Sequence, residues 1–250
     1  MQEFESLLEG SVEAHGHLCP GQVVGVRMAM LGCRLIGLDD PTCRDQIKKL
    51  IVFVEMDRCT ADAVAYVTGV KLGRRSLKFM DYGIMAATFV NLQTGKAYRV
   101  ISTEEARDLA PVYAPEAATK TSQQLEAYKS MPDSVLFRVQ KVELKLTEFD
   151  MPGPTRSKVI CTRCGQIVRD RREVSQEGHI LCKPCTAESY FKDPQDITWP
   201  DMNWTPGQSE PKSPEKTRIE KHSKPAFEQK KRQNNGSQRK SYSAKKYPLH

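Results

Sequence analysis

Two histidines and a cysteine stand within five positions near the start of the chain, in the heptapeptide HGHLCPG at residues 15–21. Imidazole nitrogen and thiolate sulfur are the ligands that zinc and related metals prefer. Pro20 leads into an apolar run and suits the first turn of a helix, where its missing N–H has no partner to lose. Cys19 is therefore expected at a helix N-terminus, where the unsatisfied N–H groups and the helix dipole favour a thiolate and lower its pKa.

A second cysteine, Cys59, stands at a similar place, between an apolar strand pattern and the next helix pattern. If the two loops meet, His17, Cys19 and Cys59 supply three ligands and leave a fourth position open, which is typical of a catalytic metal. Asp57 and Asp62 flank Cys59, and we expect them to accept hydrogen bonds behind the ligands or to transfer protons.

These residues by themselves make a weak case, because a cysteine at a helix start is more often a small buried hydrophobe. Three alternatives stay open at this point: core cysteines, a metal centre, or a metal-free thiol pair that forms a Cys19–Cys59 disulfide on oxidation. His15 is interpreted as a cation at the end of a helix rather than a ligand. Cys33 lies inside an apolar helix pattern and is expected in the core.

The remaining cysteines form two tight pairs, Cys161/Cys164 and Cys182/Cys185, with 17 residues between them. This spacing is typical of a structural zinc site in which two short loops complete a tetrahedron. Because four thiolates fill the coordination sphere, the Zn²⁺ is expected to be structural. We expect residues 166–180 to form a hairpin that turns at 176–178, and residues 183–191 to form a closing helix.

Hydrophobic periodicity predicts an α+β fold. The expected helices cover residues 3–15, 20–38, 60–68, a segment starting at 102 and about 119–129; the expected strands cover 49–56, 76–82, 86–92, 97–101 and 135–146. We therefore predict a core domain over 1–150 with a mixed or antiparallel sheet, a linker over 151–155 and a zinc-ribbon or treble-clef-like finger over 156–193. Residues 194–250 are predicted to be a disordered basic tail.

The net charge of +7 is concentrated at the C-terminus, since residues 206–250 hold 12 lysines and arginines against four glutamates. The finger and this tail could bind a nucleic-acid backbone, but a solvated tail is favoured because aromatic residues that could stack on bases are few. The sequence lacks an apolar run long enough for a membrane span and a signal-peptide pattern, so a cytoplasmic protein is expected.

The segments HGHLCPGQVVGVRM (15–28) and EMDRCTADA (55–63), with DYG at 81–83, resemble the signature of the FmdE family, which takes its name from formylmethanofuran dehydrogenase. The resemblance covers roughly residues 10–190. It implies an α+β domain followed by a four-cysteine zinc finger, a homodimer, and a metal or active-site cluster at His17, Cys19 and Cys59. The sequence departs from the family pattern at KLGRR (71–75), on the expected rim of the cleft.

We therefore predict a metal-binding protein with a structural zinc and a second metal, Zn²⁺ being the first candidate, in a His/Cys active site. A metal-activated thiolate or water would act on a small electrophile there, and Asp57 or Asp62 would handle protons. The resemblance implies a role beside a molybdenum or tungsten enzyme of one-carbon metabolism. The alternatives are a nucleic-acid interaction module and the thiol redox protein.

Overall fold

The computed structural model describes residues 1–186 and 189–196. The predicted basic tail therefore lies outside the described residues, apart from 194–196. The helices are α1 (Phe4–His15), α2 (Pro20–Ile36), α3 (Cys59–Thr68), α4 (Glu104–Tyr113), α5 (Lys120–Ser130) and α6 (Asp133–Leu136). The strands are β1 (Leu50–Val54), β2 (Leu77–Phe79), β3 (Ala86–Asn91), β4 (Ala97–Ser102), β5 (Phe137–Lys141), β6 (Lys158–Ile160), β7 (Ile167–Arg169), β8 (Val174–Gln176) and β9 (His179–Leu181).

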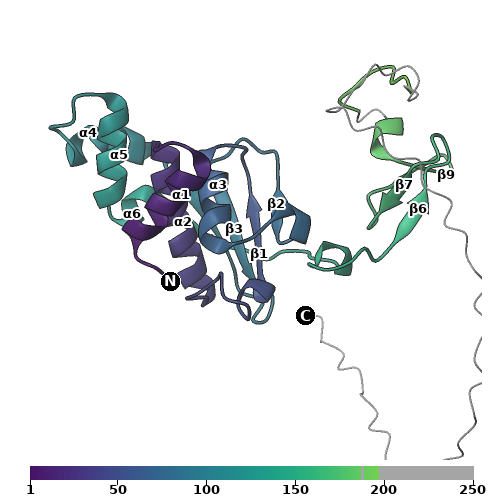
Figure 1. The fold of residues 1–250 in the computed structure, drawn as a ribbon, viewed down its shortest axis with the longest axis horizontal. Coiled ribbons are helices and arrows are strands. Elements are labelled where there is room, and N and C mark those ends of the chain that lie inside the picture. The colour runs from purple at the N-terminus through teal and green to yellow at the C-terminus, as the bar shows by residue number, and fades with distance from the viewer. Residues whose placement is uncertain (187–188, 197–250) are drawn as a thin grey trace, which may run out of the picture. The chain divides into compact units, whose positions relative to one another are not determined.

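The first five strands form one mixed sheet in the order β2-β1-β3-β4-β5 (Figure 1). Strands β1 and β2 are parallel, and α3 connects them, whereas the other neighbouring pairs are antiparallel. The predicted α+β fold with a mixed sheet is confirmed.

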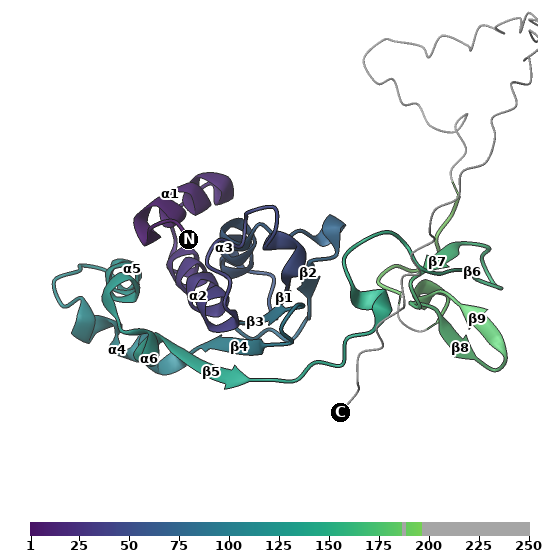
Figure 2. The ribbon, with the colours of Figure 1, turned by 90° about the horizontal axis from the view of Figure 1, so that it is seen from below.

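Helices α1, α2 and α3 cover one face of this sheet (Figure 2). The core between them contains Val52, Phe89 and Val100 from the strands and Val26 and Val64 from the helices. The Phe89 ring occupies the space that a side chain at position 32 of α2 would need, and Gly32 leaves that space free. The glycines of α2 therefore allow the close packing that positions its N-terminus.

The opposite face of the sheet carries a smaller apolar cluster built on Ile51, Val90 and Ala97. Residues 142–146 pack on this cluster through Val142, Leu144 and Leu146, and the Val142 N–H donates to the Ala97 carbonyl at 3.1 Å. The predicted strand over 135–146 is therefore shorter than expected. Its hydrogen-bonded ladder ends at Lys141, although its apolar alternation continues to be buried.

The finger contains two short antiparallel hairpins, β6–β7 and β8–β9. The predicted hairpin over 166–180 is wrong in its pairing, because β7 pairs with β6 around the first cysteine pair instead of with β9. Its turn was placed correctly, since β8 ends at Gln176 and β9 begins at His179. The predicted closing helix is limited to one 3₁₀ turn (Lys183–Cys185), and the described residues 189–196 contain no helix.

Across the described ranges, 1–186 and 189–196, no helix combines the length and apolarity needed to cross a membrane.

Candidate metal centres

Three chain segments meet at the candidate N-terminal site. Helix α1 ends at His15, where Gly16 adopts a left-handed conformation (φ 97°) and its N–H donates to the Val12 carbonyl at 2.8 Å. This reversal turns the chain toward Cys19, which is the N-cap of α2. Cys59 begins α3, as the sequence predicted. Both cysteines therefore stand at helix N-termini.

The close approach of α2 and α3 brings the two cysteines together. A Cβ at position 21 would lie 3.0 Å from the Cys59 Cβ, and a Cβ at position 25 would lie 2.7 Å from the Thr60 carbonyl oxygen. The Thr60 hydroxyl also donates to the Gly21 carbonyl at 3.2 Å. Glycine at 21 and 25 thus removes the steric barrier between the two helix starts.

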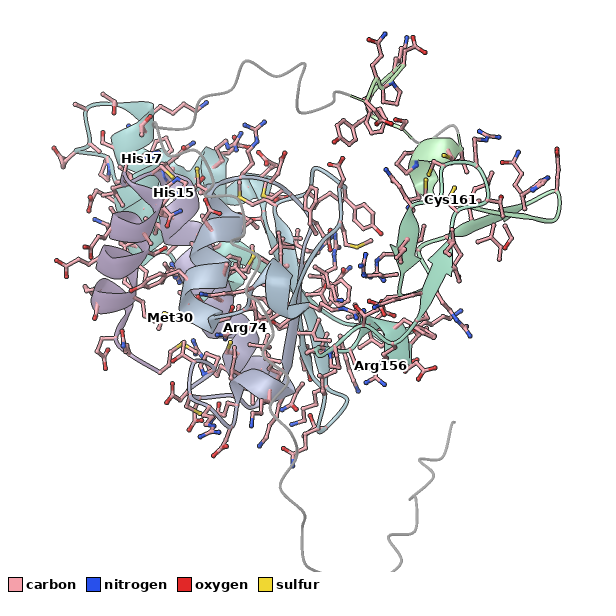
Figure 3. All side chains as sticks on the ribbon, turned by 45° about the vertical axis from the view of Figure 1, so that its right-hand side comes forward. His15, His17, Met30, Arg74, Arg156 and Cys161 are labelled. Atoms are coloured by element: carbon pink, nitrogen blue, oxygen red, sulfur yellow. The ribbon has the colours of Figure 1, made fainter. Side chains whose placement is uncertain are left out.

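The ligand atoms of His15, His17, Cys19 and Cys59 all lie within 4.8 Å of one another. The structure thus brings together the three residues that the sequence selected and adds His15, which the sequence analysis set aside. Figure 3 shows His15 and His17 close together at the end of α1. Their ring centroids are 4.7 Å apart, with the rings tilted by 38°.

His15 has the surroundings of a metal ligand. Its Nδ1 atom lies 2.9 Å from the Oδ2 atom of Asp62, and its Nε2 atom is buried without a hydrogen-bond partner. An imidazole that is oriented by a carboxylate through one nitrogen and is free at the other is the usual arrangement behind a metal. His15 is also in the last turn of α1, but its Asp62 contact and buried free nitrogen distinguish it from a simple helix-end cation.

Gln22 is a site residue that the sequence analysis missed. It is fully buried, and its amide donates to the Cys59 carbonyl at 2.8 Å while its Oε1 accepts from the Ser11 hydroxyl at 2.5 Å. These two bonds connect α1, α2 and α3 directly behind the cluster. A polar residue within the apolar run of α2 was the available signal.

Burial raises the pKa of the Cys59 thiol, and the neighbouring Cys19 raises it further. The expectation that a helix N-terminus alone would favour the Cys59 thiolate is therefore wrong for the metal-free site. The backbone N–H of Cys59 acts in the predicted direction but is outweighed. A bound metal cation would supply the missing stabilisation, because thiols bind metals as thiolates.

The second motif also contains acidic residues that do not join the cluster. Asp57 is exposed, and the described His/Cys/Asp/Glu clusters do not include it, so its predicted role at the site is not supported. Glu55 is buried and accepts from Arg99 at 2.7 and 2.6 Å, which ties the end of β1 to β4. Burial raises the pKa of the Cys33 thiol to about 12, consistent with the core position that was predicted.

A cavity of about 520 Å³ opens beside Cys19 and Cys59. Its other walls come from α4, α5 and the segments before α4, which are far from the cysteines in the sequence. The lining residues are Cys19, Pro20, Gly21, Val24, Met56, Arg58, Cys59, Thr60, Gly83, Met85, Ser102, Thr103, Glu104, Arg107, Gln124 and Tyr128. Residues 71–75, which were expected at the rim of the cleft, are not among them.

The finger forms a separate candidate centre. The sulfur atoms of Cys161, Cys164, Cys182 and Cys185 lie within 4.8 Å of one another, with 3.6 Å between Cys164 and Cys182. Figure 3 shows sulfur atoms gathered near Cys161. Gly165 provides the positive φ (73°) that closes the first loop, and its N–H donates to the Cys161 carbonyl at 2.9 Å.

The four thiols of the finger differ in how easily they ionise. The backbone N–H of Cys182 and further N–H groups of the first loop lower the pKa of Cys161 to about 6. A hydrogen bond with Cys182, together with burial, raises the pKa of Cys185 to about 12. A metal cation would neutralise this crowding of sulfur, so the cysteine clusters have the chemistry to hold metal ions. His179 is exposed and lies outside the cluster.

The fold and these clusters define a class of protein: an α+β domain with a His/Cys cluster beside a cavity, followed by a four-cysteine finger. The chain matches the family described as FmdE, molybdenum formylmethanofuran dehydrogenase operon, over residues 14–144. The chain belongs to this family. The matched segment contains the complete His/Cys cluster and ends before the finger.

Two further proteins are similar to this chain. A protein from Archaeoglobus fulgidus described as a "Probable S-adenosyl-L-methionine-binding protein" is 26% identical over 200 residues, which are 74% of this chain and 53% of that protein. The chain thus spans about half the length of this curated relative. An FmdE-like protein of tungsten formylmethanofuran dehydrogenase from Syntrophus aciditrophicus has a crystal structure with a TM-score of 0.50 and 20% identity, covering 76% of this chain and 95% of that one. This likeness supports the fold.

Proposed function

We propose that this FmdE-family protein holds two zinc ions, a structural one in the finger and a reactive one at the N-terminal cluster. The buried, unpartnered Nε2 atom of His15 carries the proposal, because a metal ion would give it the partner it lacks. His15, Cys19 and Cys59 are the three permanent ligands. His17 is exposed and serves as the exchangeable fourth ligand, which gives way to substrate.

Zinc bound at this cluster would supply a Lewis acid to a small molecule in the adjoining cavity. The residues of the chain provide the positioning. Asp62 fixes the orientation of the His15 ring, and Gln22 holds the Cys59 backbone. Cys19 and Cys59 face the cavity, whereas the histidines do not line it. The cysteine side is therefore where a substrate would approach.

The biological setting is part of the proposal. The family description refers to a formylmethanofuran dehydrogenase operon, and this supports a role beside a molybdenum or tungsten enzyme of one-carbon metabolism. The homodimer follows from the family resemblance. A cytoplasmic location fits eight free cysteines, because reducing conditions keep thiols available for metal.

The nucleic-acid alternative receives little support from the finger. Arg171 lies over the Phe149 ring at 4.4 Å, Arg172 donates to the Asp170 carbonyl, and Arg163 donates to the Cys185 carbonyl. Three of the four finger arginines thus make contacts within the chain. Arginines that bind a phosphate backbone need their guanidinium groups free.

Elemental analysis of the anaerobically purified full chain tests the proposed function. We expect two zinc ions per chain, one after Cys59→Ala or His15→Ala, and also one after Cys182→Ala, which removes the finger metal instead. Cys43→Ala is the matched control, since Cys43 lies outside both clusters, and should keep two. One zinc in the unaltered protein, together with a Cys19–Cys59 disulfide on mild oxidation, would establish the thiol redox alternative.

A further inference from the structure

We propose that the cavity beside Cys19 and Cys59 takes a small molecule with a single carboxylate, which binds to Arg107 while the opposite end faces the cysteines. This inference rests on the proposed function, because the metal cluster gives the cavity its reactive end. It adds the chemical class of the ligand and the residue that selects it.

The dimensions of the cavity fit a small organic molecule. Its volume of about 520 Å³ lies within the range of ordinary ligand pockets. Its lining includes the apolar side chains of Val24, Met56 and Met85. A ligand with a polar group at each end and a short apolar body matches these walls.

Arg107 is a cation that a ligand can reach. It comes from α4, and its Nη1 atom lies 3.4 Å from the Glu104 carboxylate, with side-chain exposures of 47% for Arg107 and 75% for Glu104. An ion pair this exposed is weak and can exchange one carboxylate for another. The buried Tyr128 also hydrogen-bonds Arg107, and this restricts the guanidinium on the cavity wall.

The charges of the wall favour one negative charge on the ligand. The charged lining residues are Arg58, Glu104 and Arg107, which sum to a single positive charge. A guanidinium offers two parallel N–H groups that match the two oxygens of a carboxylate. Thr103 does not compete for this role, because its hydroxyl donates to the Val135 carbonyl and accepts from the Ala106 N–H.

Calorimetric titration of the zinc-loaded full chain with matched thiols tests this inference. The probes are a homologous series of ω-mercaptocarboxylates, with alkanethiols and aminoalkanethiols of the same chain lengths. At the best-fitting length we expect the carboxylate to bind roughly tenfold more tightly than the neutral thiol, the gain of one charge-assisted hydrogen-bonded pair. The aminoalkanethiol should bind more weakly than either.

Arg107→Gln should abolish the preference for the carboxylate and leave the affinity for the neutral thiol unchanged. Arg44→Gln removes the same charge from an exposed arginine outside the cavity and should keep the preference. Equal affinities for carboxylate and neutral thiols in the unaltered protein, or an unchanged preference in Arg107→Gln, would overturn the inference. Zinc content measured on the same samples separates this failure from failure of the metal site itself.

Discussion

The Nδ1 atom of His15 lies 2.9 Å from the Oδ2 atom of Asp62, which joins the last turn of α1 to the first turn of α3 across 47 positions of sequence. The contact leaves Nε2 as the free nitrogen of a ring that is 13% exposed. It therefore determines which nitrogen would bind a metal. The cluster depends on a residue outside its own ligand set.

Asp62→Asn should weaken metal binding at the N-terminal cluster by about 10–100-fold, because the amide carries no charge to strengthen the His15 ligand. Competition with a chromophoric chelator would measure the affinity. Asp57→Asn is the matched control, since Asp57 is exposed near Cys59 but outside the cluster, and should change little. Equal effects of the two substitutions would contradict the role given to Asp62.

Gln22→Leu should lower the free energy of unfolding by about 1–3 kcal/mol, because it leaves the buried Ser11 hydroxyl and the Cys59 carbonyl without their partners. Chemical denaturation would measure this loss, and zinc affinity at the N-terminal cluster should fall with it. Gln93→Leu, at an exposed position, serves as the control. Unchanged stability and zinc affinity would show that Gln22 does not hold the helices together.

Gly25→Ala should push α3 away from α2, because the new methyl group would lie 2.6 Å from the Ala63 Cβ and 2.7 Å from the Thr60 carbonyl oxygen. We expect a loss of about 1–3 kcal/mol in unfolding free energy. Gly73→Ala adds the same methyl group where no atom lies within 4 Å, and should be tolerated. Thermal unfolding of the two variants side by side would reveal whether the helix contact is as close as the structure indicates.

Arg75→Gln should loosen the segment that leads into the finger. Arg75 donates to the Asp170 carboxylate at 2.8 Å and to the Phe149 carbonyl. The Arg156 N–H, and then the Ser157 N–H and nearby arginines, lower the pKa of Asp170 below 3.8. Because this pKa is depressed in the folded state, the stabilisation is present above that value and is lost as pH falls through the lowered one.

The destabilisation caused by Asp170→Asn should therefore be the same at pH 6 and pH 8, since Asp170 stays ionised throughout this range. Thermal midpoints at the two pH values would measure it, and hydrogen exchange over residues 147–157 should increase in both the Arg75 and Asp170 variants. A difference that grows from pH 8 to pH 6 would show that another titrating group is responsible.

Several features could be predicted from the sequence because they depend on residues close together in the chain. The starts of α2 and α3 follow from Pro20 and from the apolar periodicity after Cys59. The four cysteines of the finger form two local pairs, so their spacing already indicates one cluster. The parts that required the tertiary structure involve residues far apart in sequence: Asp62 in place of Asp57 beside the ligands, and Arg107 in the cavity wall.

The sequence by itself determined the α+β class, the family and the residue types available for metal binding, because periodicity and short-range spacing are written along the chain. The tertiary structure decided that His15 joins His17, Cys19 and Cys59, since this depends on how the ends of α1 and α3 meet. It also decided the pairing of the finger hairpins and the walls of the cavity. Those contacts depend on packing between distant segments, which local patterns do not specify.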